Sequence, residues 1–192
     1  MKRIAAATST IVMLFAGTAA AGAADYVIDL THSHILFMVD HLGFAKMVGV
    51  FTNFGGNFSL DPENVAASKL AVTIKADSLQ TQFAARDKDL KGADWFNIIE
   101  FPEMTFVGTE FASKDERTGT ITRNLTLRGT TKPVTLDVVL NKIGQNPLDK
   151  QNSAGLSARG TLKRSDFGMK AFLGPIGDEV DLIIEIEAKQ KS

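Results

Sequence analysis

Cysteine is absent from the 192 residues of this chain. Its absence excludes disulfide bonds, a thiol nucleophile, thiolate metal sites and a lipidated N-terminal cysteine. There are only three histidines, and the formal net charge is -1, so the chain has no bulk attraction for nucleic acids or anionic membranes. Local features must therefore determine what the protein binds.

Tryptophan and tyrosine are also scarce, with one of each against thirteen phenylalanines. Phenylalanine supplies a large apolar area without a polar group, so this bias favours an oily interior. A solid hydrophobic core uses phenylalanine in the same way as the wall of an apolar cavity does. Composition therefore leaves both interpretations open.

No apolar run is as long as the roughly 20 residues that a membrane-spanning helix needs. The N-terminus has two basic residues, then an Ala-rich apolar segment (residues 4–17) and then a run of small residues (19–24). This order is typical of a cleavable secretory signal peptide. We therefore predict a signal peptide over residues 1–23 and one mature domain over 24–192. The mature domain is expected in the periplasm, if the source has two membranes, without stable membrane insertion.

Apolar and polar residues alternate along most of the mature chain, which indicates strands with one apolar face. The pattern is clearest where Val48, Val50, Phe54 and Phe58 occupy even positions. The connections are too short for crossovers, so the strands must pair antiparallel. We expect about eight strands: two within 26–60, and then 70–76, 104–111, 118–127, 134–142, 156–163 and 180–188.

Residues 78–91 break the alternation and predict one helix that begins between Ser78 and Gln82, with Ser78 as the candidate N-cap and Gly92 as the candidate C-terminal stop. The predicted fold is all-β, an antiparallel barrel of about eight strands with one helix. Glycines at positions 49, 55 and 56 favour a barrel, because closing a sheet requires sharp bends and close backbone approach. An open β-sandwich is the alternative.

Catalytic and metal-binding patterns are weak. His32 and His34 share one face of a strand, but no third ligand accompanies them, so no metal site is predicted. Ser33 points away from His32, and no Gly-x-Ser-x-Gly elbow or nucleotide-binding motif occurs. We predict no catalytic residue and no cofactor. The alternative is an enzyme that acts on an apolar substrate with His32 or His34 as the base.

An apolar lumen results if the even-numbered face of the second strand points inward, and it would suit a long hydrocarbon chain. A solid core is the alternative. Three polar residues near the predicted opening are candidates for holding the head group of a ligand: His32, Arg86 and Arg164. The predicted lining residues are Phe37, Val39, Val50, Phe54, Phe58, Val72, Ile74, Phe83, Trp95, Phe106, Leu125, Leu127 and Phe167.

Several blocks of the sequence carry a family resemblance. His32-Ser33, Asp94-Trp95-Phe96, the segment 125–134 (Leu-Thr-Leu-Arg-Gly-Thr-Thr-Lys-Pro-Val) and the segment 164–169 (Arg-Ser-Asp-Phe-Gly-Met) resemble, in this order, the YceI family of periplasmic lipocalin-like polyisoprenoid-binding proteins. Arg128 departs from the pattern, because members often have histidine there.

The resemblance implies a lipocalin-like barrel without enzymatic activity. It also implies that the barrel transports or sequesters a long polyisoprenoid lipid, of the quinone or prenyl diphosphate type, and that it often forms a homodimer. A ligand-free, stress-related structural module is the remaining alternative.

Overall fold

A computed structural model describes residues 22–61 and 64–191. Of the predicted signal peptide, residues 1–21 lie outside the described residues. The strands are β1 (Ala24–Ile28), β2 (His34–His41), β3 (Ala45–Phe51), β4 (Phe54–Leu60), β5 (Lys69–Lys75), β6 (Leu79–Gln80), β7 (Glu103–Ser113), β8 (Thr118–Leu127), β9 (Thr130–Gln145), β10 (Asn152–Lys163) and β11 (Ile176–Gln190). The helices are α1 (Ala84–Leu90) and three 3₁₀ turns, η1 (Val65–Ala67), η2 (Ala76–Ser78) and η3 (Arg164–Phe167).

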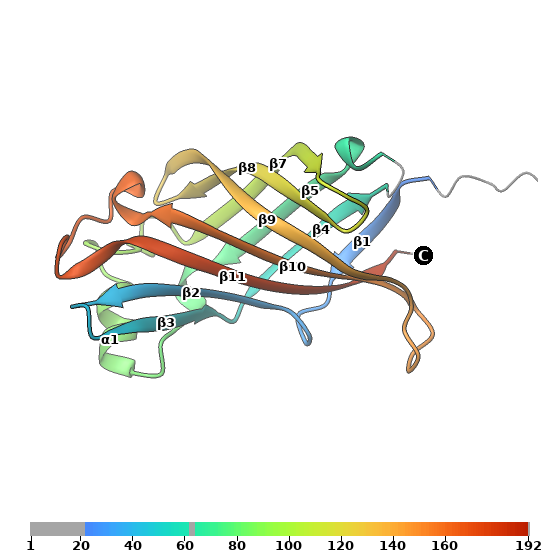
Figure 1. The fold of residues 1–192 in the computed structure, drawn as a ribbon. Coiled ribbons are helices and arrows are strands. Elements are labelled where there is room, and N and C mark those ends of the chain that lie inside the picture. The colour runs from blue at the N-terminus through green and yellow to red at the C-terminus, as the bar shows by residue number, and fades with distance from the viewer. Residues whose placement is uncertain (1–21, 62–63, 192) are drawn as a thin grey trace, which may run out of the picture.

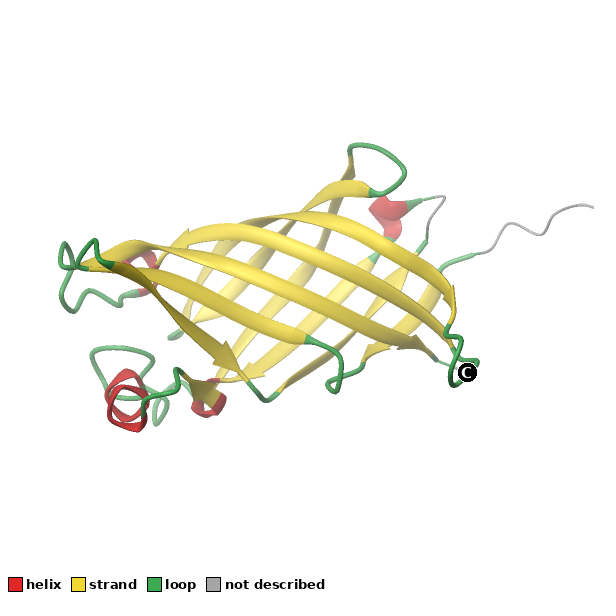
Figure 2. Ribbon diagram, turned by 60° about the horizontal axis from the view of Figure 1, so that its bottom comes forward, coloured by secondary structure: helices red, strands yellow, loops and turns green. Residues whose placement is uncertain are grey.

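The described strands form one antiparallel sheet that closes on itself, because β1 pairs with both β4 and β11. β2 continues the course of β1 along β11, and β3 and β4 are the two halves of another long strand. If each of these pairs counts as one bent strand and β6 as an extension of β5, the described chain forms an eight-stranded barrel (Figures 1 and 2). The barrel prediction is confirmed, and the open sandwich is wrong.

The two ends of the barrel carry different connections. The β2–β3 turn, α1 and the β10–β11 connection gather at one end, which we call the α1 end (Figure 1). The β7–β8 turn, the β9–β10 loop and the C-terminus lie at the opposite end, which we call the β7–β8 end (Figure 1).

The break between β3 and β4 reverses which positions are buried. In β3 the odd-numbered Phe51 is buried at 7% exposure, whereas in β4 the even-numbered Phe54 and Phe58 are buried at 4% and 6%. The two residues between the strands, at positions 52 and 53, shift the alternation by one. The prediction of one even-numbered inward face therefore holds for β4 and is wrong for β3.

Helix α1 begins later than predicted. Ser78 lies in η2 and donates its hydroxyl hydrogen bond to the carbonyls of Lys75 and Asn53 instead of capping the helix. The segment before α1 is held by Asp87, whose carboxylate accepts hydrogen bonds from the N–H and the hydroxyl of Thr81. At the other end of the helix, the N–H of Gly92 donates to the carbonyl of Asp89 at 2.8 Å, in accord with the predicted stop.

Neighbouring groups approach two of the three glycines closely, a side chain at Gly49 and the backbone at Gly56. A Cβ atom on Gly49 would lie 2.2 Å from the tip of the Phe37 ring, which covers this glycine across the β2–β3 pair. A Cβ atom on Gly56 would lie 2.2 Å from the carbonyl oxygen of Ala71 on β5. Gly55, in contrast, has open space around it. The absence of side chains at Gly49 and Gly56 thus lets neighbouring groups pack inside a strongly curved sheet.

Candidate functional site

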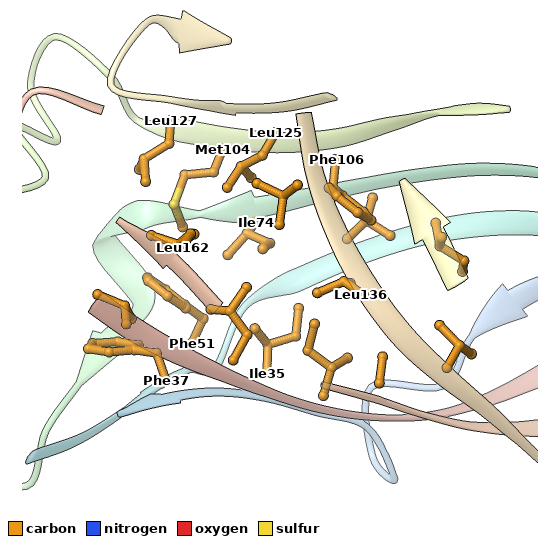
Figure 3. Close-up of a pocket in the computed structure, with 18 of the residues that line it drawn as sticks. Ile35, Phe37, Phe51, Ile74, Met104, Phe106, Leu125, Leu127, Leu136 and Leu162 are labelled. Carbon is orange, nitrogen blue, oxygen red and sulfur yellow. The ribbon is translucent and has the colours of Figure 1, made fainter. Parts of the chain in front are cut away.

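The barrel is hollow. A cavity of about 780 Å³ occupies its interior, which is within the range of roughly 300–1,000 Å³ typical of small-molecule sites. Its wall is formed mainly by inward-pointing aliphatic and aromatic side chains from opposite sides of the barrel (Figure 3). The labelled members are Ile35, Phe37, Phe51, Ile74, Met104, Phe106, Leu125, Leu127, Leu136 and Leu162. The solid core considered from the sequence is therefore wrong.

Most of the predicted lining residues lie in this wall: Phe37, Val39, Phe58, Val72, Ile74, Trp95, Phe106, Leu125 and Leu127. Four others do not. Phe54 and Phe167 are buried in the packed core, at 4% and 2% exposure, and Phe83 is 59% exposed just before α1. Val50 belongs to the part of β3 where the alternation is reversed and has no place in the wall.

Sequence reasoning missed a second group of wall residues, which includes Ile35, Phe51, Met104, Leu136, Leu182 and Ile184. Leu182 and Ile184 belong to the same period-two pattern of β11 that predicted the strand. Because alternate residues of a strand share one face, this pattern could have identified both as inward-pointing residues.

At the α1 end, Arg164 is a buried cation beside an aromatic ring. Its side chain is 3% exposed, and its guanidinium donates hydrogen bonds to three backbone carbonyls, those of Met169 (2.8 Å), Gly177 (2.8 Å) and Ile176 (3.0 Å). The guanidinium also lies 5.2 Å from the centre of the Trp95 ring. Burial lowers the pKa of Arg164, and the nearby Asp178 carboxylate opposes this effect.

Trp95 joins this cation to the loops of the α1 end. Its ring stacks on that of Phe172 with 6.5 Å between centroids, and both residues lie in the cavity wall. Arg128, at the position where the resemblance would place a histidine, donates hydrogen bonds to the carbonyls of Gly168 (2.6 Å) and Ala93 (2.8 Å). It thereby ties the segment after η3 to the segment after α1.

Arg86 is the second guanidinium in the cavity wall at this end. It donates to the hydroxyl oxygen of Thr81 at 2.8 Å and to the carbonyl oxygen of Thr81 at 2.7 Å. The third head-group candidate, His32, is absent from the wall. It lies in the loop between β1 and β2, and its side chain is 63% exposed.

The loop that contains His32 is held by a local hydrogen-bond network. The Asp29 carboxylate accepts from the N–H and the hydroxyl of Thr31 at 2.9 and 2.6 Å, and lies 3.2 Å from His32 Nδ1. The hydroxyl of Thr31 contributes most to lowering the pKa of Asp29 to about 2, although partial burial opposes it. Ser33 exchanges two 3.0 Å hydrogen bonds with the backbone of Glu187, so its role here is structural.

One group in the described chain has the composition of a metal site. Ligand atoms of Asp29, His32 and Glu187 lie within 4.8 Å of one another. The ammonium of Lys189 lies 3.7 Å from the same Asp29 carboxylate and already supplies a positive charge there. The hydrogen bonds and this ion pair account for the arrangement without an ion.

At the β7–β8 end the cavity wall combines polar and apolar side chains. The polar ones are Ser113, Asp115, Glu116, Arg117 and Thr118, and Leu60, Phe111 and Leu140 are among the apolar ones. Asp115 accepts hydrogen bonds from the Thr118 hydroxyl and from the N–H groups of Arg117 and Thr118, which lower its pKa. Arg117 in turn donates to the carbonyls of Leu140 and Asn141 on β9. The turn is therefore fixed by its own polar groups.

A family model described as a YceI-like domain matches residues 26–188. The chain belongs to the YceI family. Among its relatives, the UPF0312 protein Ent638_1570 of Enterobacter is 44% identical over 176 residues, which are 91% of each chain. A YceI protein of Campylobacter jejuni has a solved structure that covers 80% of this chain and 90% of its own, with 31% identity and a TM-score of 0.70.

A further solved structure shares the fold. It is described as a polyisoprenoid binding domain from Saccharophagus degradans, and it covers 86% of this chain and 98% of its own, with a TM-score of 0.62. At 13% identity this likeness shows the fold alone. None of the helices described in this YceI-family chain is long and apolar enough to cross a membrane.

Proposed function

We propose that this protein binds a long-chain polyisoprenoid lipid, of the quinone or prenyl diphosphate type, and transports or sequesters it in the periplasm. The observation that supports this most is the cavity, which has a mainly apolar wall along the inside of the barrel and includes residues at both barrel ends. Such a wall suits a long hydrocarbon chain, because the gain from burying it grows by about 0.8 kcal/mol for each CH₂ group.

We place the head group of the ligand at the α1 end. Arg86 and Arg164 both lie in the wall there, and Arg164 lies against Trp95. A guanidinium group favours electron-rich oxygen atoms, such as those of a quinone carbonyl or a phosphate. The isoprenoid chain would then extend between the strands toward the β7–β8 end.

Binding accounts for these residues better than catalysis does. His32 and His34, the bases of the alternative enzyme, are both exposed and outside the cavity wall. A general base must reach the proton that it removes. Of the three histidines, the one in the cavity wall is His41, which was not a candidate base.

Export and self-association belong to the same proposal. The predicted signal peptide would deliver the protein to the periplasm, where a carrier could move lipid between membranes. For a homodimer, the chain offers the outer face of β2, where Leu36 and Met38 lie partly exposed.

Native mass spectrometry of the exported protein, purified without detergent, tests the proposal. We expect an added mass that organic extraction identifies as one long isoprenoid lipid. Purification of an unrelated periplasmic protein from the same cells controls for lipid carried along by chance. A protein that is empty and that also fails to take up added long-chain quinones would contradict the proposal.

A further inference from the structure

We infer that the loops at the α1 end form a docking surface for a lipid bilayer, through which the cavity exchanges its lipid. This inference rests on the proposed function. Six large apolar residues of these loops are exposed, and we call them the apolar rim: Leu42 (52%), Phe44 (90%), Phe83 (59%), Ile99 (95%), Phe172 (68%) and Leu173 (41%).

The rim comes from three separate connections. Leu42 and Phe44 lie in or beside the β2–β3 turn, Phe83 and Ile99 flank α1, and the last two rim residues precede β11. Figure 1 shows all three connections at one end of the barrel, away from the C-terminus. The described loops of the opposite end carry one comparable residue, Leu148, which is 91% exposed.

The rim is continuous with the cavity. Leu42 and Phe172 are more than half exposed and at the same time belong to the cavity wall. A lipid that leaves a membrane through this opening would pass from the bilayer interior to the lumen along apolar side chains. Elsewhere it would have to expose its hydrocarbon chain to water.

Backbone geometry adds a second, independent observation. Leu42 and Phe172 adopt φ angles of 59° and 52°, a left-handed conformation that favours glycine or asparagine and is costly for bulky side chains. Both positions nevertheless carry large apolar residues and present them to solvent. The stack on Trp95 accounts for part of the Phe172 side chain, and insertion into a membrane surface would bury the exposed remainder of both side chains.

The charges beside the rim decide which membrane it suits. The exposed or half-exposed lysines 88, 91 and 170 are matched by the exposed acids Asp89, Asp94 and Glu100. This end therefore has no excess of positive charge that would select anionic lipids. The surface fits a zwitterionic bilayer, which it would contact peripherally and reversibly through side chains at the tips of loops.

Flotation with phosphatidylcholine vesicles tests the docking surface. The variant combines Phe44→Ser and Ile99→Ser, because both side chains are at least 90% exposed and can change without loss of packing. The matched control is Leu148→Ser at the opposite end, which is equally exposed. We expect the double variant to lose vesicle binding by about tenfold and to transfer quinone between vesicles about tenfold more slowly. The control, and the equilibrium affinity of both proteins for quinone, should stay within about twofold.

The outcomes distinguish this inference from the proposed function. Wild-type protein that binds quinone but never floats with vesicles would overturn the docking surface and leave the proposed function intact. Vesicle binding that depends on the rim, without any uptake of quinone, would support the docking surface and contradict the proposed function. If the double variant instead abolishes self-association in sedimentation experiments, the rim is a contact between two copies, and the inference is wrong.

Discussion

At the α1 end, the cavity wall meets six exposed apolar loop residues, whereas at the β7–β8 end it meets a turn that carries polar and charged residues, among them Asp115, Glu116 and Arg117. The same barrel forms both ends, so strand geometry does not cause the difference. It comes from the connecting loops, which the fold leaves free to vary. On this contrast rests our proposal that lipid exchange and head-group recognition belong to the α1 end.

The largest effect expected from this contrast concerns ligand length. If the head group binds at the α1 end and the chain fills the lumen, each added isoprene unit buries five more carbons, worth about 4 kcal/mol, so quinone affinity should rise by roughly 1,000-fold per unit until the lumen is full. Quenching of Trp95, the single tryptophan, measures this directly. Equal affinity for short and long chains would mean that only the α1 end binds the ligand.

Arg164 supports the α1 end structurally as well as electrostatically. Arg164→Met leaves three backbone carbonyls without their buried donor, so we expect the free energy of unfolding to fall by about 3 kcal/mol. Chemical denaturation measures the change. The control is Arg159→Met, whose guanidinium is paired with Glu185 and is half exposed, and which should cost less than about 1 kcal/mol. Equal losses in both variants would contradict the structural role of Arg164.

Asp29 stabilises the bend between β1 and β2, away from the head-group region. Its folded pKa of about 2 lies below its ordinary value of 3.8, so its contribution is present above pH 3.8 and is lost as the pH falls toward 2. Asp29→Asn should therefore cost about 1–2 kcal/mol at pH 7 and almost nothing near pH 2. Thermal unfolding across this pH range measures it, with the exposed Asp137→Asn as the control. Quinone affinity should not change.

Much of the barrel could be predicted from the alternation of apolar and polar residues, because period two identifies strands whatever their neighbours. That alternation does not show where one strand ends and the next begins. Because the break at Thr52 and Asn53 was not predicted, Val50 was wrongly placed in the cavity wall. Because η2 and β6 were not predicted, the helix was expected to begin too early. Phe54 and Phe167 were wrongly predicted to line the cavity for a related reason. An apolar residue in a packed core and an apolar residue in a cavity wall look the same in the sequence.

Head-group residues were harder to place than wall residues. Arg86 and Arg164 lie in the cavity wall because α1 and η3 are at the same barrel end, whereas His32 lies exposed in the loop between β1 and β2. These positions depend on contacts between distant segments, such as the hydrogen bonds from Arg128 to Gly168 and Ala93. No local pattern in the sequence encodes them.

Filling the lumen tests most directly whether it holds the ligand. Val72 lies in the cavity wall, and its neighbour Ala71 on β5 is exposed on the outside of the barrel. We predict that Val72→Trp lowers long-chain quinone affinity, measured by calorimetry, by about 100-fold and that Ala71→Trp leaves it unchanged, with the same circular dichroism for both. Ala158→Phe, also in the wall, provides a second variant if Val72→Trp does not fold. Unchanged affinity in a folded lumen variant would contradict the cavity as the lipid site.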